Sequence, residues 1–126
     1  MTITHINPAT LHRNPAFSQA TIVEGGRTLY IGEQNGTDAE GAIAGDFAAQ
    51  TRQALQNVLA ILADVGAEQS AVAKLTIYLK YGESIEEGFA ASGEVWGQHA
   101  TAITVVQVPA LGRPEALVGV EAVASV

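Results

Sequence analysis

Two apolar segments near the C-terminus constrain the fold most strongly. They cover residues 102–111 and 117–124, and both are rich in valine and alanine. Short apolar runs with β-branched residues, bounded by glycine and proline, are typical of strands buried in a sheet. Residues 112–115 form the turn between them. Glu121 is the one acidic residue in the otherwise apolar last strand, which makes it a candidate functional group.

A helical period governs residues 46–65. Apolar side chains recur three and four positions apart, and polar residues fall largely on the other face. Asp46 is a suitable residue to cap the start and Gly66 to end the helix. The pattern predicts an amphipathic helix with one buried face. The inner positions are Phe47, Thr51, Ala54, Leu55, Val58, Leu59, Leu62 and Val65.

A strand and a second helix are predicted next. Residues 72–80 alternate in polarity, with Leu75, Ile77 and Leu79 on one side. Residues 84–98 return to a helical period. The inner side of this second helix is expected to carry Ile85, Phe89, Ser92, Val95 and Trp96.

The N-terminal third of the chain is expected to form strands and turns. Two Asn-Pro pairs within residues 7–15 mark a loop after a short first strand. Residues 20–23 and 27–32 are expected to form a hairpin about Gly25-Gly26, where glycine allows positive φ. Residues 35–41 are expected to form a loop.

The expected order is β-β-β-α-β-α-β-β in a single domain over residues 1–126. This is an α/β (α+β) chain whose two helices share one face of a mixed sheet, because 126 residues cannot cover both faces. The second face would then expose a wide apolar patch. We therefore expect several copies to pack sheet against sheet.

Composition excludes several classes of function. The net charge is −7 and the six lysines and arginines are scattered, which disfavours nucleic acid or an anionic membrane as a partner. The absence of cysteine excludes disulfides, a thiolate nucleophile and thiolate metal ligands. No run approaches the roughly 20 apolar residues of a membrane span, and no leader pattern opens the chain. A cytoplasmic protein without a membrane segment is the expectation.

The spacing of the histidines and serines does not favour a metal site or a catalytic triad. His5, His12 and His99 lie far apart, without the spacing of a ligand pair, and no metal site is predicted. His99 is expected at the surface, at a helix end. The serines have no histidine and aspartate arranged around them as in a hydrolase triad.

Several segments together resemble the Rid/YjgF family of reactive intermediate deaminases. They are the two C-terminal strands, residues 16–20 and the strand end at residues 30–36, and the similarity extends over nearly the whole chain. The resemblance implies a homotrimer of chorismate-mutase-like subunits with a cleft at each subunit boundary. It also implies hydrolysis of enamines or imines to a keto acid and ammonia. No cofactor is expected, since the imine carbon is already electrophilic.

The same resemblance indicates residues on one side of the cleft. Phe17 corresponds to an aromatic residue of the N-terminal loop in the family. Gly32, Gln34 and Asn35 belong to the strand end whose backbone and polar groups bind substrate. Glu33 stands in that strand end where the family usually has glycine.

Two positions depart from the family pattern. Ile103 lies where the family has an arginine that binds the substrate carboxylate, and Gly119 where it has a glutamate that positions water. Glu121 follows two residues later on the same strand face. A desolvated Arg–carboxylate contact contributes on the order of 1.5–3 kcal/mol. An amino-acid-derived imine with a free carboxylate is therefore expected to bind poorly, and an uncharged ligand is the natural inference.

Another strand could supply the carboxylate that the family has at the position of Gly119. Glu33 would return an acid to the same cleft if its strand meets the last strand there. The alternative is that Glu33 is a solvated acid at a strand end.

Two further residues are candidates for the cleft, and two functions are compatible with it. Trp96 is expected as an apolar wall or support, and Arg13 as either an anion clamp or an ordinary surface residue. The first function is hydrolysis of a C=N or enamine substrate without a free α-carboxylate, with Glu121 and Glu33 as acid/base candidates. The second is binding of a small metabolite or a partner protein in the same cleft, without catalysis. RNA cleavage has no support from charge or from a histidine pair.

Overall fold

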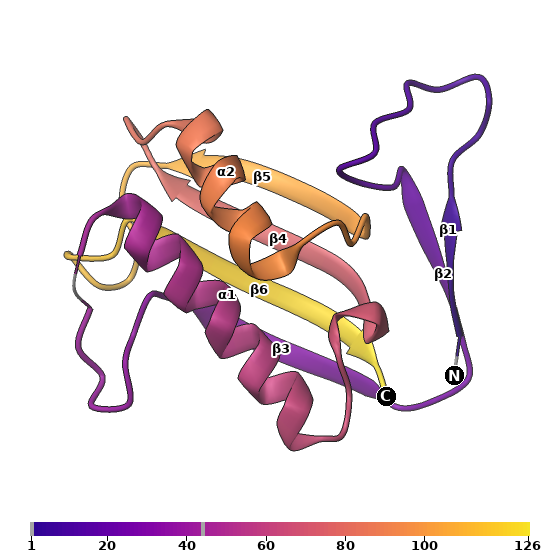
Figure 1. Cartoon of the computed structure of the whole chain (residues 1–126), viewed down its shortest axis with the longest axis horizontal. Coiled ribbons are helices and arrows are strands. Elements are labelled where there is room, and N and C mark those ends of the chain that lie inside the picture. Colours follow the sequence, from indigo (N-terminus) through magenta and orange to yellow (C-terminus); the bar gives the residue numbers. More distant parts are fainter. Residues whose placement is uncertain (1, 44) are drawn as a thin grey trace.

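The computed structural model describes residues 2–43 and 45–126, and it is an α+β fold with a four-stranded mixed sheet and two helices (Figure 1). A separate two-stranded sheet, β1 with β2, lies beside it. No helix in these residues is long and apolar enough to cross a bilayer. The elements are β1 (Thr2–Ile6), β2 (Ala20–Glu24), β3 (Thr28–Gln34), α1 (Phe47–Asp64), a short 3-10 helix (Gln69–Ala71), β4 (Val72–Lys80), α2 (Ile85–Trp96), β5 (Ala102–Val108) and β6 (Val118–Ser125).

The strand order in the main sheet is β3-β6-β4-β5. Strand β4 runs parallel to β5, and β6 runs antiparallel to its neighbours β3 and β4. Both predicted C-terminal strands are present, but β4 lies between them. The first ends at Val108 rather than at residue 111, because Pro109 has no N–H to continue the ladder.

The predicted hairpin between residues 20–23 and 27–32 is wrong. Strand β2 pairs with β1, and β3 pairs with the distant β6. Gly25 and Gly26 do adopt positive φ, of 73° and 80°, but they turn the chain from one sheet into the other. Arg27 and Val126 exchange two backbone hydrogen bonds of 2.8 Å, which start the β3–β6 ladder. The long-range partner wins because it buries the inner face of β3 in the core.

Helix α1 forms as its period predicts. The Asp46 carboxylate accepts a hydrogen bond of 2.9 Å from the Ala49 N–H, and Gly66 has a φ of 74° just beyond the helix end. Leu55 and Leu62 are buried against the sheet. Val65 lies outside this core and is exposed, because the helix has already ended at Asp64.

Helix α2 turns Trp96 inward as predicted, and Val95 packs against the core, but its first half turns a different face inward. Its buried residues are Gly88, Ala91 and Trp96, whereas Ile85 is 52% exposed and Phe89 67% exposed. A β-carbon on Gly88 would lie 3.0 Å from the Cζ of Phe47, so this glycine lets the two helices approach closely. Ile85 and Phe89 are consequently left on the exposed side of α2.

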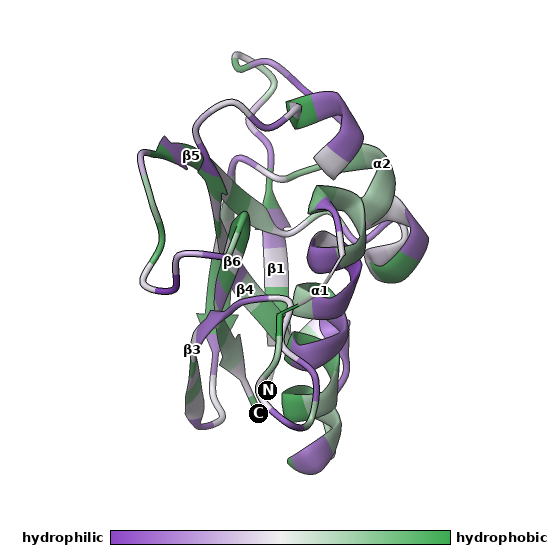
Figure 2. Cartoon of the chain, turned by 90° about the vertical axis from the view of Figure 1, so that its left-hand side faces the viewer, coloured by the Kyte–Doolittle hydropathy of each residue, from purple (hydrophilic) through white to green (hydrophobic). Residues whose placement is uncertain are grey.

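The opposite face of the sheet has no helix over it. Figure 2 shows α1 and α2 together on one side of the strands. We call the other side the open face; it carries Tyr30, which is exposed, and the side chains of Tyr78 and Glu121. Lys74 donates a hydrogen bond of 2.7 Å to the hydroxyl of Thr104 on the neighbouring strand β5.

Candidate functional site

A pocket of about 610 Å³ opens between α2, β5 and the N-terminal loop. Pockets of about 300–1,000 Å³ are typical of small-molecule sites. Among the described residues that line this pocket there is no aspartate, glutamate, lysine or arginine. Its wall is built mainly from the apolar side chains Phe17, Ile85, Phe89, Trp96, Ile103 and Val105.

The sheet register explains why β5 contributes to this pocket. Ile103 is paired with Leu75 and Val105 with Ile77, which places both β5 side chains on the helix side of the sheet. Strand β5 lies at the sheet edge, where α1 does not cover it. The apolar side chains of its inner face therefore border an opening rather than a closed core.

The N-terminal loop is attached to the start of β5. The Ser18 N–H donates a hydrogen bond of 2.9 Å to the carbonyl of Thr101, and Ser18 is itself buried. Phe17, directly before it, is half-buried and lines the pocket.

Three predicted site residues thus meet in the pocket: Phe17, Trp96 and Ile103. Sequence reasoning missed Ile85 and Phe89, which it assigned to the inner side of α2. The small residues Gly88 and Ala91, three positions apart, were the signal that another face of the helix packs inward.

A second group of predicted residues lies on the open face. The Tyr78 hydroxyl donates a hydrogen bond of 2.6 Å to Glu121 Oε1. The side chain of Glu33 lies over Gly119, where a β-carbon would be 2.5 Å from the Glu33 Cδ. The Asn35 amide donates to Glu33 Oε1 at 3.3 Å and to the Val118 carbonyl at 3.0 Å.

Negative charge gathers around Tyr78 in this group. The pKa of Tyr78 is raised above its usual value of 10.0, first by the hydrogen bond to Glu121, then by burial and by the charges of Glu121 and Glu33. Tyr78 therefore remains a protonated donor at neutral pH. Within residues 2–43 and 45–126 the ion pairs join Arg52 to Glu94 and Arg113 to Glu115, so neither Glu33 nor Glu121 has a cation at ion-pair distance.

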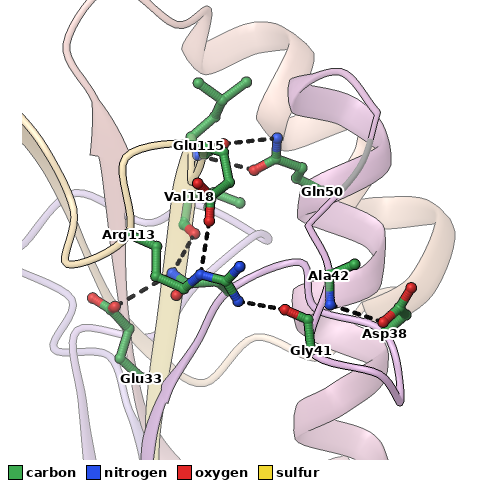
Figure 3. A network of polar contacts seen from close by, with 10 residues as sticks. Glu33, Asp38, Gly41, Ala42, Gln50, Arg113, Glu115 and Val118 are labelled. Atoms are coloured by element: carbon green, nitrogen blue, oxygen red, sulfur yellow. Dashed lines mark hydrogen bonds and ion pairs between the residues drawn. The ribbon is translucent and has the colours of Figure 1, made fainter.

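A polar network fixes the loop that leads into β6. Gln50 on α1 accepts a hydrogen bond of 2.9 Å from the Leu117 N–H and donates one of 3.3 Å to the Glu115 carbonyl. Arg113 binds the Glu115 carboxylate at 2.7 Å and also the Gly41 carbonyl. Figure 3 shows these contacts, with Glu33 nearby. The network ties β6, and with it Gly119, to α1 and to the loop before it.

The remaining predicted residues take no part in the pocket. Arg13 is exposed and does not line it. Gly32 is exposed on β3, with no atom within 4 Å of an added β-carbon, and Gln34 donates a hydrogen bond of 3.0 Å back to the Gly32 carbonyl. A single chain thus places the apolar pocket on the helix side of the sheet and the carboxylates on the open face.

His99 lies at the pocket, contrary to the expectation of a surface position. Its ring is half-buried, 5.7 Å from the ring of His5. The pKa of His99 is lowered below its usual 6.5 by burial and then by the charge of His5, so the ring is neutral at pH 7. Among the described residues no group of three or more histidines, cysteines or acids is placed to hold a metal ion.

Comparison with known proteins places this fold in one family. Residues 8–126 match the sequence profile of the Endoribonuclease L-PSP family. A RutC family protein of Pyrococcus horikoshii is 33% identical over 110 residues, which cover 86% of this chain and 85% of that protein.

Solved structures agree with the sequence comparison. YyfB from Yersinia pestis, a protein of the conserved Rid family, is 31% identical, with a TM-score of 0.89 over 100% of both chains. Rv2704 from Mycobacterium tuberculosis, of the YjgF/YER057c/UK114 family, has the same fold, with 24% identity and a TM-score of 0.69 over 99% of this chain and 100% of the other. The chain is therefore a member of the Rid/YjgF family, whose members are also described as L-PSP and RutC proteins.

Proposed function

We propose that this protein hydrolyses an imine or enamine that has no free α-carboxylate and releases ammonia. The observation that carries the proposal is the uncharged lining of the pocket around Ile103. A substrate carboxylate would lose its hydration there without gaining a cationic partner, which is strongly unfavourable. A neutral substrate carries no such penalty.

The proposed site is completed by a second copy of the chain. The carboxylates lie on the open face and the pocket lies on the helix side, so one chain does not hold them together. Packing of open faces in a homotrimer would cover exposed residues such as Tyr30. If the edge strand β5, which borders the pocket, lies against the open face of the next copy, the pocket also meets Glu33 and Glu121 of that copy.

Glu33 is the proposed acid/base group. Among the described residues its carboxylate accepts a side-chain hydrogen bond only from Asn35, at 3.3 Å, whereas Glu121 accepts the short bond from Tyr78. Glu33 would take a proton from the attacking water and pass it to the nitrogen. The oxygen of water bonds to the imine carbon, which gives a carbinolamine. A second proton then passes from its hydroxyl group to the nitrogen, the carbon–nitrogen bond breaks, and a carbonyl compound and ammonia leave. For an enamine, the β-carbon is protonated first.

A second candidate is binding without catalysis. It is favoured by the same pocket, because His99 is the only titratable side chain among the described residues that line it. A protein that merely holds a neutral metabolite needs no carboxylate near the ligand. The two candidates differ in their need for Glu33.

The test is ammonia release from two freshly generated substrates, 2-aminoacrylate and an imine without a carboxylate. We expect faster hydrolysis of the neutral imine, lost in Glu33→Gln and retained in the control Glu24→Gln, an exposed acid on β2. Ile103→Arg should shift the preference towards 2-aminoacrylate. No acceleration of either substrate by the wild type or by Ile103→Arg would support binding instead. Sedimentation equilibrium tests the trimer separately.

A further inference from the structure

The pocket leaves large apolar side chains open to solvent. Ile85 and Phe89 on α2 and Val105 on β5 are all exposed, and all three line it. They lie next to the half-buried Phe17 and Ile103. Exposed apolar groups gathered in one concave site mark a place where a ligand removes apolar surface from water.

The electrostatics of the pocket exclude an anionic occupant. The described lining contains no acidic or basic side chain apart from His99, whose pKa is lowered. An anionic group would lose its hydration there without gaining a cationic partner. The other polar side chains on the described lining are uncharged: Asn14, Thr51, Ser92 and Gln98.

The volume of the pocket argues for a bulky occupant. A space of about 610 Å³ is far larger than a substrate with a methyl side chain would fill. Unfilled space forfeits the dispersion contacts that its lining could make. An aromatic or branched aliphatic group would fill more of this space, against lining side chains such as Phe17, Phe89 and Ile103.

We infer that this pocket selects ligands with a bulky, uncharged, apolar group, and that Phe17, Phe89 and Ile103 determine this selectivity. The inference deepens the proposed function, since it names the side chain that the preferred imine carries. It also stands if the protein only binds its ligand. The selectivity follows from the lining, whereas hydrolysis requires the carboxylates of the open face.

Binding is tested with two dyes that differ in charge. Phenylnaphthylamine is uncharged, and anilinonaphthalenesulfonate is a close relative with an added sulfonate. We expect fluorescence titration of the intact protein to show at least tenfold tighter binding of the uncharged dye. Phe89→Ser should weaken that binding about tenfold or more, as expected for loss of a buried aromatic contact. Tyr81→Ser removes another exposed aromatic side chain, one that does not line this pocket, and should leave binding unchanged.

Three binding results would overturn the inference. They are equal binding of the two dyes, no binding of the uncharged dye, and unchanged binding in Phe89→Ser. The second would mean that the apolar lining is not available to a bulky uncharged ligand. Because Phe89 is exposed, its replacement should not unfold the protein, and circular dichroism checks this.

Hydrolysis provides an independent measurement. Neutral imines with a methyl, an isobutyl and a benzyl group are compared by their kcat/KM for ammonia release. Each additional buried methylene should raise kcat/KM roughly fourfold. Hydrolysis without this trend overturns the inference but leaves the proposed function standing. Selective dye binding without hydrolysis supports the inference and contradicts the proposed function.

Discussion

Glu33 occupies the space that a side chain on Gly119 would need. A β-carbon at position 119 would lie 2.5 Å from the Cδ of Glu33 and 2.7 Å from its Cγ. Positions 33 and 119 therefore share one side-chain volume on the open face, although they belong to different strands. The carboxylate in this volume comes from β3, and the glycine on β6 makes room for it.

Gly119→Ala tests this relationship by displacing the Glu33 carboxylate. Glu33 is an exposed, flexible side chain, so it can move and the free energy of unfolding should change by less than about 1 kcal/mol. We expect kcat/KM for the neutral imine to fall by tenfold or more, because a displaced acid no longer reaches the reacting atoms. Steady-state ammonia release together with urea unfolding measures both effects.

Exchange of the two residues provides the complementary test. In the double variant Glu33→Gly, Gly119→Glu, the carboxylate returns to the same volume from β6. We expect this protein to recover activity that Glu33→Gly alone has lost. Equal inactivity of the single and double variants would show that the origin of the carboxylate matters and that shared volume is insufficient.

Gly36→Ala should destabilise the fold through a backbone clash. The added β-carbon would lie 2.7 Å from the Cα of Gln50 and 2.8 Å from its carbonyl oxygen, and backbone in a helix cannot yield cheaply. Overpacking of this kind typically costs 1–3 kcal/mol. Urea unfolding should show a loss of about 2 kcal/mol. Gly112→Ala is the control, since no atom lies within 4 Å of its added β-carbon; equal losses in both variants would refute the clash.

Asp46→Ala should weaken the start of α1. The Asp46 side chain accepts a hydrogen bond from the Ala49 N–H, and loss of such a cap typically costs about 1 kcal/mol. Asp64, exposed at the other end of α1, faces the unfavourable end of the helix dipole. We therefore expect Asp64→Ala to be neutral or slightly stabilising. A lower melting temperature for Asp64→Ala than for Asp46→Ala would contradict these roles of the two carboxylates.

His99 should make stability depend on pH in the acidic range. Its folded-state pKa is lowered, so the unfolded chain binds a proton first as the pH falls. Well above pH 6.5, His99 is neutral in both the folded and the unfolded chain, so its titration does not change the stability. Stability is lost as the pH drops through 6.5 towards the lowered folded-state pKa, and the loss is constant below it.

The variant His99→Gln isolates this effect from that of the carboxylates. Melting temperatures of both proteins are measured between about pH 7.5 and pH 5, a range that spans the ordinary histidine pKa. We expect the difference between them to shift in favour of the variant as the pH falls. A difference that stays constant over this range would rule out a titrating His99.

Local sequence patterns determined the elements whose signals lie close together in the chain. Helix α1 follows from its period and from Asp46, and β4 from its alternating polarity, because neighbouring residues alone decide capping and amphipathicity. The apolar residue at position 103 and the acids at positions 33 and 121 were equally readable from the sequence.

Tertiary structure alone decided which strands pair and how the helices and side chains are oriented. Strand β3 pairs with β6 rather than with β2, since burial against a distant strand outweighs a favourable local turn. Close packing of Gly88 on Phe47 set the rotation of α2 and turned Phe89 into the pocket. The register of β3 on β6 placed Glu33 over Gly119, a contact between residues far apart in sequence. Such contacts depend on the packing of the whole chain, which no local pattern encodes.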